Sequence, residues 1–195
     1  MTIASTTSDQ ILASARSFII AGGYGGFSYA DISDVVGIRK ASIHHHFPSK
    51  VDLVRTLVTR YRQEAETGLA GLSAAVPDAL DVLTAFAGNW ARCIEDASIP
   101  FCVCAQLASE LPALPPEVAA EVTAYFGSLS SWLAAVMQRG SDEGRLAIET
   151  SAAVEAEMFM ATVHGAMLSA RAQNNPALFD AILTPTLRRL ARAAR

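Results

Sequence analysis

The chain of 195 residues is 51% hydrophobic and only 17% charged, which excludes a disordered protein and requires extensive buried surface. No apolar run approaches the roughly 18 residues that a membrane span needs, and the first residues lack the basic-then-apolar layout of a signal peptide. Three cysteines at no zinc-like spacing suit a reducing compartment. We therefore expect a cytoplasmic protein with no membrane partner, no metal and no cofactor.

Charge is distributed unevenly along the chain, whose net charge is −4. Residues 1–62 contain seven basic and four acidic residues, a net of +3, whereas residues 63–195 contain eight and fifteen, a net of −7. The chain's two lysines, Lys40 and Lys50, both lie in the basic segment. This asymmetry indicates a phosphate-facing head on an acidic body, although an ordinary solvated face would give the same count.

Hydrophobic spacing predicts four helices in residues 8–70. The first begins at a cap formed by Ser8 or Asp9 and ends at the glycines of 22–26. The second follows Ser28 and Asp31, which resemble a capping box, and ends at Gly37. The third covers residues 39–46, and a longer helix runs from about 49 to 70. The side chains expected to face the core are Ile11, Ala15, Phe18, Ile19, Ile32, Val35, Val36, Ile43 and Phe47.

Further helices are expected over residues 78–96, 99–111, 116–139, 149–173 and 176–192, with prolines and asparagines at the joints. No alternating apolar and polar pattern indicates a strand. The sequence therefore predicts an all-α protein with two domains. A three-helix head occupies residues 1–62, and a C-terminal helical bundle occupies residues 63–195.

The two short helices within residues 28–47 have the outline of a helix-turn-helix. The segment from Phe27 to Leu53, FSYADISDVVGIRKASIHHHFPSKVDL, resembles the TetR-family DNA-binding signature, above all in its last nine residues. The resemblance covers about residues 9–62. It implies a transcriptional regulator, most commonly a repressor, in which the helix-turn-helix binds operator DNA and the C-terminal helices bind a small-molecule effector.

The resemblance also implies roles for individual residues. Ser28 and Tyr29 would contact phosphate, Lys40 and Ser42 would lie at the major groove, and Lys50 would clamp a phosphate. Two residues depart from the family pattern. Arg39 replaces the usual serine and can add a phosphate or guanine contact, and Ala41 replaces the usual glycine.

Three consecutive histidines end the third helix. His44 occupies the place of a tyrosine that touches the DNA backbone in the family, and His45 and His46 follow as DNA-proximal positions. The triplet also suggests a metal site. Because consecutive helical residues point about 100° apart, the three side chains cannot converge on one ion, and we expect no metal there.

Large and adaptable apolar side chains are frequent in residues 78–172. Aromatic and methionine side chains with a few polar groups line ligand sites in helical bundles. Plain core packing explains these residues better when each is taken alone, so the pocket rests mainly on the resemblance. The candidate ligand contacts are Phe86, Trp90, Gln106, Glu110, Tyr125, Trp132, Met160 and His164.

Cys102 and Cys104 support a rival mode of sensing, by an oxidant or an electrophile. Pro100 and Phe101 place Cys102 near a helix start, where a thiol can ionise more readily. Nothing basic flanks either cysteine in sequence, and two cysteines this close on a helix point to different faces, which makes a local disulfide awkward. We therefore favour reversible ligand binding and keep thiol sensing as the alternative.

The last two predicted helices are rich in small residues such as Ala161 and Gly165, which allow helices to approach closely. Two such helices from each subunit can form a four-helix homodimer interface. A two-fold operator in double-stranded DNA also requires a dimer, because its recognition helices lie about 34–36 Å apart. No motif supports an enzyme, and a helical binding protein without DNA function remains the alternative from another class.

Overall fold

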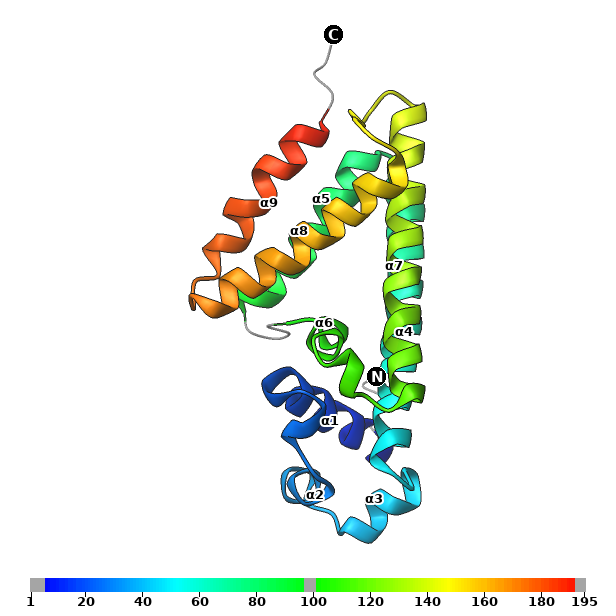
Figure 1. The fold of residues 1–195 in the computed structure, drawn as a ribbon, viewed down its shortest axis with the longest axis vertical. Helices are drawn as coiled ribbons and strands as arrows, with labels where there is room; N and C mark the ends of the chain where they lie inside the picture. The colour runs from blue at the N-terminus through cyan, green and yellow to red at the C-terminus, as the bar shows by residue number, and fades with distance from the viewer. Residues whose placement is uncertain (1–5, 97–100, 192–195) are drawn as a thin grey trace. The chain divides into compact units, whose positions relative to one another are not determined.

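The computed structural model describes residues 6–96 and 101–191, and within them the regular structure is helical apart from one isolated bridge between Leu146 and Ala191. This arrangement confirms the predicted all-α class (Figure 1). The helices are α1 (Thr7–Gly22), η1 (Tyr24–Gly26), α2 (Tyr29–Val36), α3 (Lys40–His46), α4 (Lys50–Ala75), α5 (Ala79–Glu95), α6 (Val103–Ala108), η2 (Leu111–Ala113), α7 (Pro116–Asp142), α8 (Ala152–Ala172) and α9 (Ala177–Leu190).

The chain divides into two compact units. The first unit comprises residues 1–63 and 102–125 and so contains α1 to α3, the first half of α4, α6, η2 and the start of α7. The second unit comprises residues 64–101 and 126–195 and contains the rest of α4, α5, the rest of α7, α8 and α9. The helix-turn-helix therefore folds in one body with α6, which lies about sixty residues further along the chain.

Side-chain caps define where the first helices start. The Thr6 hydroxyl accepts the Asp9 N–H at 3.2 Å, and the Asp9 carboxylate accepts the Thr6 N–H at 3.1 Å. The predicted cap at Ser8 or Asp9 is wrong, because Asp9 serves as the reciprocal partner of a box that begins at Thr6. Ser28 and Asp31 form the predicted capping box of α2, with the Ser28 N–H donating to Asp31 at 2.7 Å.

An apolar core joins the helices of the first unit. Ile11, Ile32 and Ile43, from α1, α2 and α3, are fully buried. Burying one side chain of this size stabilises a fold by about 1.5–3 kcal/mol. The prediction that Val35 faces the core is wrong, since Val35 is 67% exposed. Val35 lies three residues after buried Ile32, at the edge of the face that meets the core, and lines a surface groove of about 600 Å³ together with residues of α1.

The second unit is organised around α8, which packs against α9 (Figure 1). Phe159 and Met167 on α8 are almost completely buried, as is Phe179 on α9. Glu155 on α8 is also buried, at 1% exposure, and its carboxylate accepts a 2.8 Å hydrogen bond from the Arg189 guanidinium on α9. That hydrogen bond lowers the pKa of Glu155 and outweighs the opposite effect of burial.

The predicted helix bounds differ most from the structure at α6. Cys102 is the N-cap of α6, which ends at Ala108, so this helix is shorter than the predicted span of 99–111. The predicted start at Ile99 and the predicted end of the last helix at Arg192 lie outside the described residues. None of the helices in the described ranges is long and apolar enough to cross a membrane.

Candidate nucleic-acid interface

The turn between α2 and α3 depends on backbone geometry and one hydroxyl. Gly37 has a φ of 72°, in the left-handed region that glycine adopts without a side-chain clash. The Gly37 N–H donates to the Ser33 carbonyl at 3.0 Å, and the Ser33 hydroxyl donates to the Ile38 carbonyl at 2.5 Å. Arg39 then caps α3 through its backbone, and its side chain makes no capping hydrogen bond. The turn therefore leaves the Arg39 guanidinium outside the fold.

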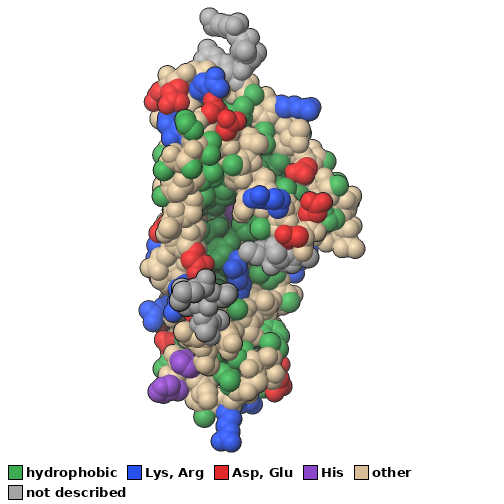
Figure 2. Space-filling model, turned by 180° about the vertical axis from the view of Figure 1, so that it is seen from behind, with side chains coloured by type: hydrophobic (Ala, Val, Ile, Leu, Met, Phe, Trp, Pro, Cys, Tyr) green, Lys and Arg blue, Asp and Glu red, His purple; other side chains and the backbone are tan. Residues whose placement is uncertain are grey.

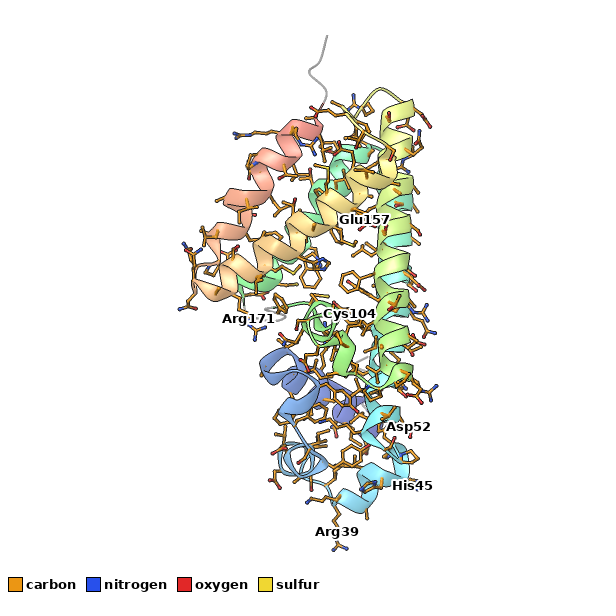
Figure 3. All side chains as sticks on the ribbon, in the orientation of Figure 1. Arg39, His45, Asp52, Cys104, Glu157 and Arg171 are labelled. Carbon is orange, nitrogen blue, oxygen red and sulfur yellow. The ribbon has the colours of Figure 1, made fainter. Side chains whose placement is uncertain are left out.

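The outward face of α3 is polar and exposed. Fully buried Ile43 is the residue of α3 that faces the core. Figure 3 shows Arg39 extending away from the ribbon, with His45 near the end of α3. In Figure 2 the histidine side chains form a surface patch. The predicted DNA contacts that the fold leaves exposed are Ser28, Arg39, Lys40, Ser42, His44, His45 and His46.

Ser28 and Tyr29, two of the predicted contacts, have partners inside the head. The Ser28 hydroxyl donates to Asp31 at 2.7 Å, and the Tyr29 hydroxyl donates to the Phe47 carbonyl at 2.9 Å. Partial burial raises the pKa of Tyr29 to about 12. The Tyr29 ring meets the His44 ring edge-on, with centroids 4.8 Å apart. These contacts tie α2 to the C-terminal end of α3.

Lys50, the predicted phosphate clamp, begins α4 and is half-buried. Its ammonium donates to the Phe27 carbonyl and lies 4.0 Å from the Phe27 ring centroid and 4.9 Å from that of Tyr24. Burial lowers the pKa of Lys50, and the Asp31 and Glu110 carboxylates oppose that shift. Lys50 therefore anchors the start of α4 to the residue that precedes the cap of α2.

Glu110, which follows α6, contacts the turn after α1. Its carboxylate accepts the Tyr24 N–H at 3.1 Å. A Cβ at Gly23 would lie 1.8 Å from a Glu110 oxygen, and the φ of +73° at Gly23 already favours glycine. Sequence reasoning placed Glu110 among the ligand contacts, because no local signal connects it to a turn 86 residues away. Glu110 joins the α6 segment to the turn after α1.

The thiols of Cys102 and Cys104 are fully buried in the first unit. The Tyr61 hydroxyl lies 3.6 Å from the Cys102 sulfur, which in turn lies 3.7 Å from the Tyr125 hydroxyl. Burial raises the pKa of the Cys104 thiol, and the neighbouring Cys102 raises it further. The thiolate is the reactive form of cysteine, so this environment disfavours reaction with oxidants and electrophiles.

The candidate ligand contacts divide between the two units. Gln106, Glu110 and Tyr125 belong to the first unit, where Glu110 and Tyr125 have the partners just described. The candidates that belong to the second unit are Phe86, Trp90, Trp132, Met160 and His164.

Aromatic rings gather in the second unit. The Phe86 ring lies 5.6 Å from the Trp132 ring, and the Phe126 ring lies 5.3 Å from the His164 ring. The Trp132 indole N–H donates to the Ser73 hydroxyl at 2.9 Å. These residues combine apolar surface with polar groups from α4, α7 and α8. Among the described residues, no three His, Cys, Asp or Glu side chains are grouped as metal ligands.

A buried helical pair, a left-handed glycine at the turn and an exposed polar second helix define a helix-turn-helix DNA-binding regulator. The chain belongs to the TetR family. Residues 11–57 match the family model of bacterial regulatory proteins of the tetR family, and residues 79–185 match that of the tetracyclin repressor-like C-terminal domain. TetR regulators bind DNA and small-molecule ligands and act as dimers.

Solved structures support the same assignment along the whole chain. A TetR-family transcriptional regulator from Agrobacterium tumefaciens is 59% identical, with a TM-score of 0.93 over 95% of this chain and 97% of that one. A TetR regulator from Legionella pneumophila is 25% identical, with a TM-score of 0.87 over 97% and 100%. FadR from Bacillus subtilis, solved in complex with stearoyl-CoA, shares the fold at 14% identity, with a TM-score of 0.73 over 93% and 98%. A search among curated proteins returned no match.

Proposed function

We propose that this regulator is a repressor that binds a two-fold operator as a homodimer and is released when a small molecule binds its C-terminal helices. The observation that carries the proposal is the exposed face of α3, where Arg39, Lys40 and Ser42 have no role in the core. Arginine and lysine donate to guanine and phosphate oxygens, and a serine hydroxyl donates to either. We assign base readout and phosphate contact to these three residues, with the histidines beside them.

Ser28, Tyr29 and Lys50 have a different role in this proposal. Their polar groups are bound within the head, so any contact they make with phosphate adds to an existing internal hydrogen bond or replaces it. We assign them to holding α2, α3 and α4 in the geometry that α3 needs. A positioning role of this kind acts equally on all DNA sequences.

The proposed dimer interface lies on α8. Val154, Met158 and Leu168 are large apolar side chains that are 47%, 48% and 58% exposed. Ala161 and Gly165 lie between them on the same helical face, and a Cβ added to Gly165 would meet nothing within 4 Å. An apolar stripe with small residues at its centre supports close packing against a second copy. On α9, which packs against α8, the small residues Ala177 and Ala181 are also exposed.

For the effector, we propose reversible binding of an apolar molecule rather than thiol chemistry. Both Cys102 and Cys104 are inaccessible, and the raised pKa of Cys104 keeps it in the unreactive thiol form. The aromatic residues of the second unit supply the kind of surface that apolar ligands bind. FadR, which shares this fold, was solved in complex with stearoyl-CoA, whose long acyl chain is apolar, and this complex supports an effector with an apolar part.

A gel-shift titration with the DNA that flanks the coding sequence tests the proposal. The full-length protein should shift this DNA at lower concentration than an unrelated duplex of equal length. An Arg39→Ala, Lys40→Ala variant should lose the preference while keeping its helical circular dichroism, because both side chains lie outside the core. Equal binding of both duplexes by the unmodified protein would reject a local operator, and no binding to any duplex would favour a helical binding protein without DNA function.

A further inference from the structure

His44 has a partner that fixes which of its ring nitrogens carries hydrogen. Its Nδ1 lies 3.2 Å from the carbonyl oxygen of Pro48. A carbonyl oxygen only accepts hydrogen bonds, so Nδ1 must carry the hydrogen of this contact. The neutral ring then has a bare Nε2, which can accept a hydrogen bond but cannot donate one.

A DNA phosphate also only accepts hydrogen bonds. While Nδ1 stays bound to Pro48, a neutral His44 ring therefore has no donor to offer to the DNA backbone. The protonated ring keeps the Pro48 contact and gains both a donor at Nε2 and a positive charge. The His44 side chain is exposed on α3, and the edge-on Tyr29 ring at 4.8 Å restricts its orientation.

We propose that His44 couples DNA binding to proton uptake, so that the affinity of this regulator for DNA increases as the pH falls from about 8 to about 6. The proposal rests on the DNA-facing role of α3 given above. The added contact is to phosphate and so raises affinity for every sequence bound in the same geometry. DNA affinity then responds to proton concentration as well as to the effector.

The ionisable groups on the elements next to His44 leave a charge change near neutral pH to imidazole. The Tyr29 phenol on α2, whose ring contacts His44, remains protonated because its pKa is about 12. The first turn of α4 carries Lys50 and Asp52, and α3 carries Lys40. Lysine and carboxylate charges do not change between about pH 6 and 8, whereas imidazole charges do. His45 and His46 are the other imidazoles on α3.

The direction in which DNA affinity changes with pH follows from the negative charge of DNA. Phosphates interact more favourably with a protonated His44 ring than with a neutral one, so proton uptake by this ring and DNA binding favour each other. Acidification must therefore tighten binding.

His45 and His46 provide matched controls. Their described contacts are ring contacts, with centroids 5.6 Å apart between the two and 6.4 Å between His46 and Phe47. No carbonyl fixes the tautomer of either ring within the described part of the chain, so a neutral ring can turn an N–H toward phosphate without taking up a proton. Replacing His45 with glutamine should therefore preserve most of the pH response.

The test is an anisotropy titration of the full-length protein with a duplex that it selects from random-sequence DNA. At constant ionic strength, wild type should bind roughly tenfold more tightly at about pH 6 than at about pH 8, about threefold from each head. His44→Tyr offers a neutral hydroxyl donor at both values, so its affinity should not change with pH and should exceed that of wild type at the higher pH. His44→Phe should bind weakly at both.

A second readout separates a phosphate contact from a change in folding. For wild type, the slope of log affinity against log salt should steepen on acidification by about 0.9 per head. The slope for His44→Tyr should not change. The proposal is overturned if wild type has the same affinity at both pH values, or if His44→Tyr and His44→Phe both keep the full pH response. If no duplex is selected at either pH, the proposed DNA-binding face fails instead.

Discussion

Two exposed helix faces of this regulator have opposite chemistry. The outward face of α3 carries arginine, lysine, serine and histidine, whereas that of α8 carries Val154, Met158 and Leu168 around two small residues. A charged face is stable in water without a partner, but a continuous apolar face is costly until something covers it. Exposure alone therefore does not define a site. The chemistry of the exposed atoms is the reason why we propose a polyanion for α3 and a second copy of the chain for α8.

The largest effect should come from blocking the α8 face. Gly165→Trp places a bulky ring where close helix contact is proposed, so the protein should become monomeric. One head then binds without the effective concentration supplied by the other, and DNA affinity should fall at least a hundredfold. Analytical ultracentrifugation and anisotropy measure the two effects.

Gly71→Trp is the matched control for this change. Gly71 is also an exposed helical glycine, on α4, with nothing within 4 Å of an added Cβ. Gly71→Trp should leave both the dimer and the affinity for DNA unchanged. A dimeric Gly165→Trp protein with wild-type DNA affinity would remove the α8 stripe from the interface, and the proposed difference between the two faces would fail.

A smaller effect should follow from breaking the ion pair beneath that face. Arg189→Ala leaves the Glu155 carboxylate buried without its guanidinium partner, and should cost about 2 kcal/mol, below the usual range for buried pairs because Arg189 is partly exposed. The exposed neighbour Arg188 provides the control, and Arg188→Ala should cost little. Urea unfolding at neutral pH measures both.

The loss of stability caused by Arg189→Ala should depend on pH in a defined direction. Arg189 lowers the folded-state pKa of Glu155, so the pair contributes stability above the unfolded carboxyl pKa of about 4.3 and loses it as the pH falls through the folded value. The difference between wild type and Arg189→Ala should therefore shrink on acidification. A difference that stays constant down to about pH 3 would show that the pair contributes through packing and not through charge.

Replacing Glu110 tests how far the stability of the head depends on the segment that contains α6. Glu110→Ala leaves the Tyr24 N–H without its acceptor and should destabilise the protein by about 1 kcal/mol. Glu110→Gln keeps an acceptor oxygen and should recover most of that stability, although it removes the charge near Lys50. If the glutamine variant is as unstable as the alanine variant, the charge matters more than the hydrogen bond to Tyr24.

Local sequence patterns predicted the head well, because its determinants are close together in the chain. Ser28 with Asp31 and the left-handed Gly37 are each readable within a few residues. Short-range reasoning failed where a residue's environment depends on distant chain segments. Val35 follows the apolar spacing yet lies on a groove, and Glu110 contacts a turn that is remote in sequence.

The residues of the candidate site also divide into those that local sequence patterns predict and those whose environment depends on distant chain segments. The accessibility of Ser42, His44 and His45 follows from helical periodicity, because these residues lie about 100° or 200° around α3 from buried Ile43. The accessibility of Arg39 and Lys40, four and three residues before Ile43, does not follow from periodicity, and accompanies their position at the start of α3. The internal partners of Tyr29 and Lys50 do not follow from periodicity, since each depends on a carbonyl presented by another segment. Which residues contact DNA remains a prediction that binding measurements must decide.

The smallest effect, on salt dependence, compares the chain's two lysines. Lys40 is exposed on α3, whereas the ammonium of Lys50 is bound to the Phe27 carbonyl between two aromatic rings. If only a free ammonium neutralises phosphate, Lys40→Ala should reduce the salt slope by about 0.9 for each phosphate that the lysine neutralised, and weaken binding about threefold at moderate salt. Lys50→Ala should instead leave the slope unchanged and lower the thermal stability of the head, since it removes an internal hydrogen bond and two cation–π interactions.

Anisotropy over a salt series, with thermal melts of the same samples, separates these outcomes. A slope that falls for Lys50→Ala but not for Lys40→Ala would mean that Lys50 leaves Phe27 on binding and clamps phosphate, as the family resemblance implies.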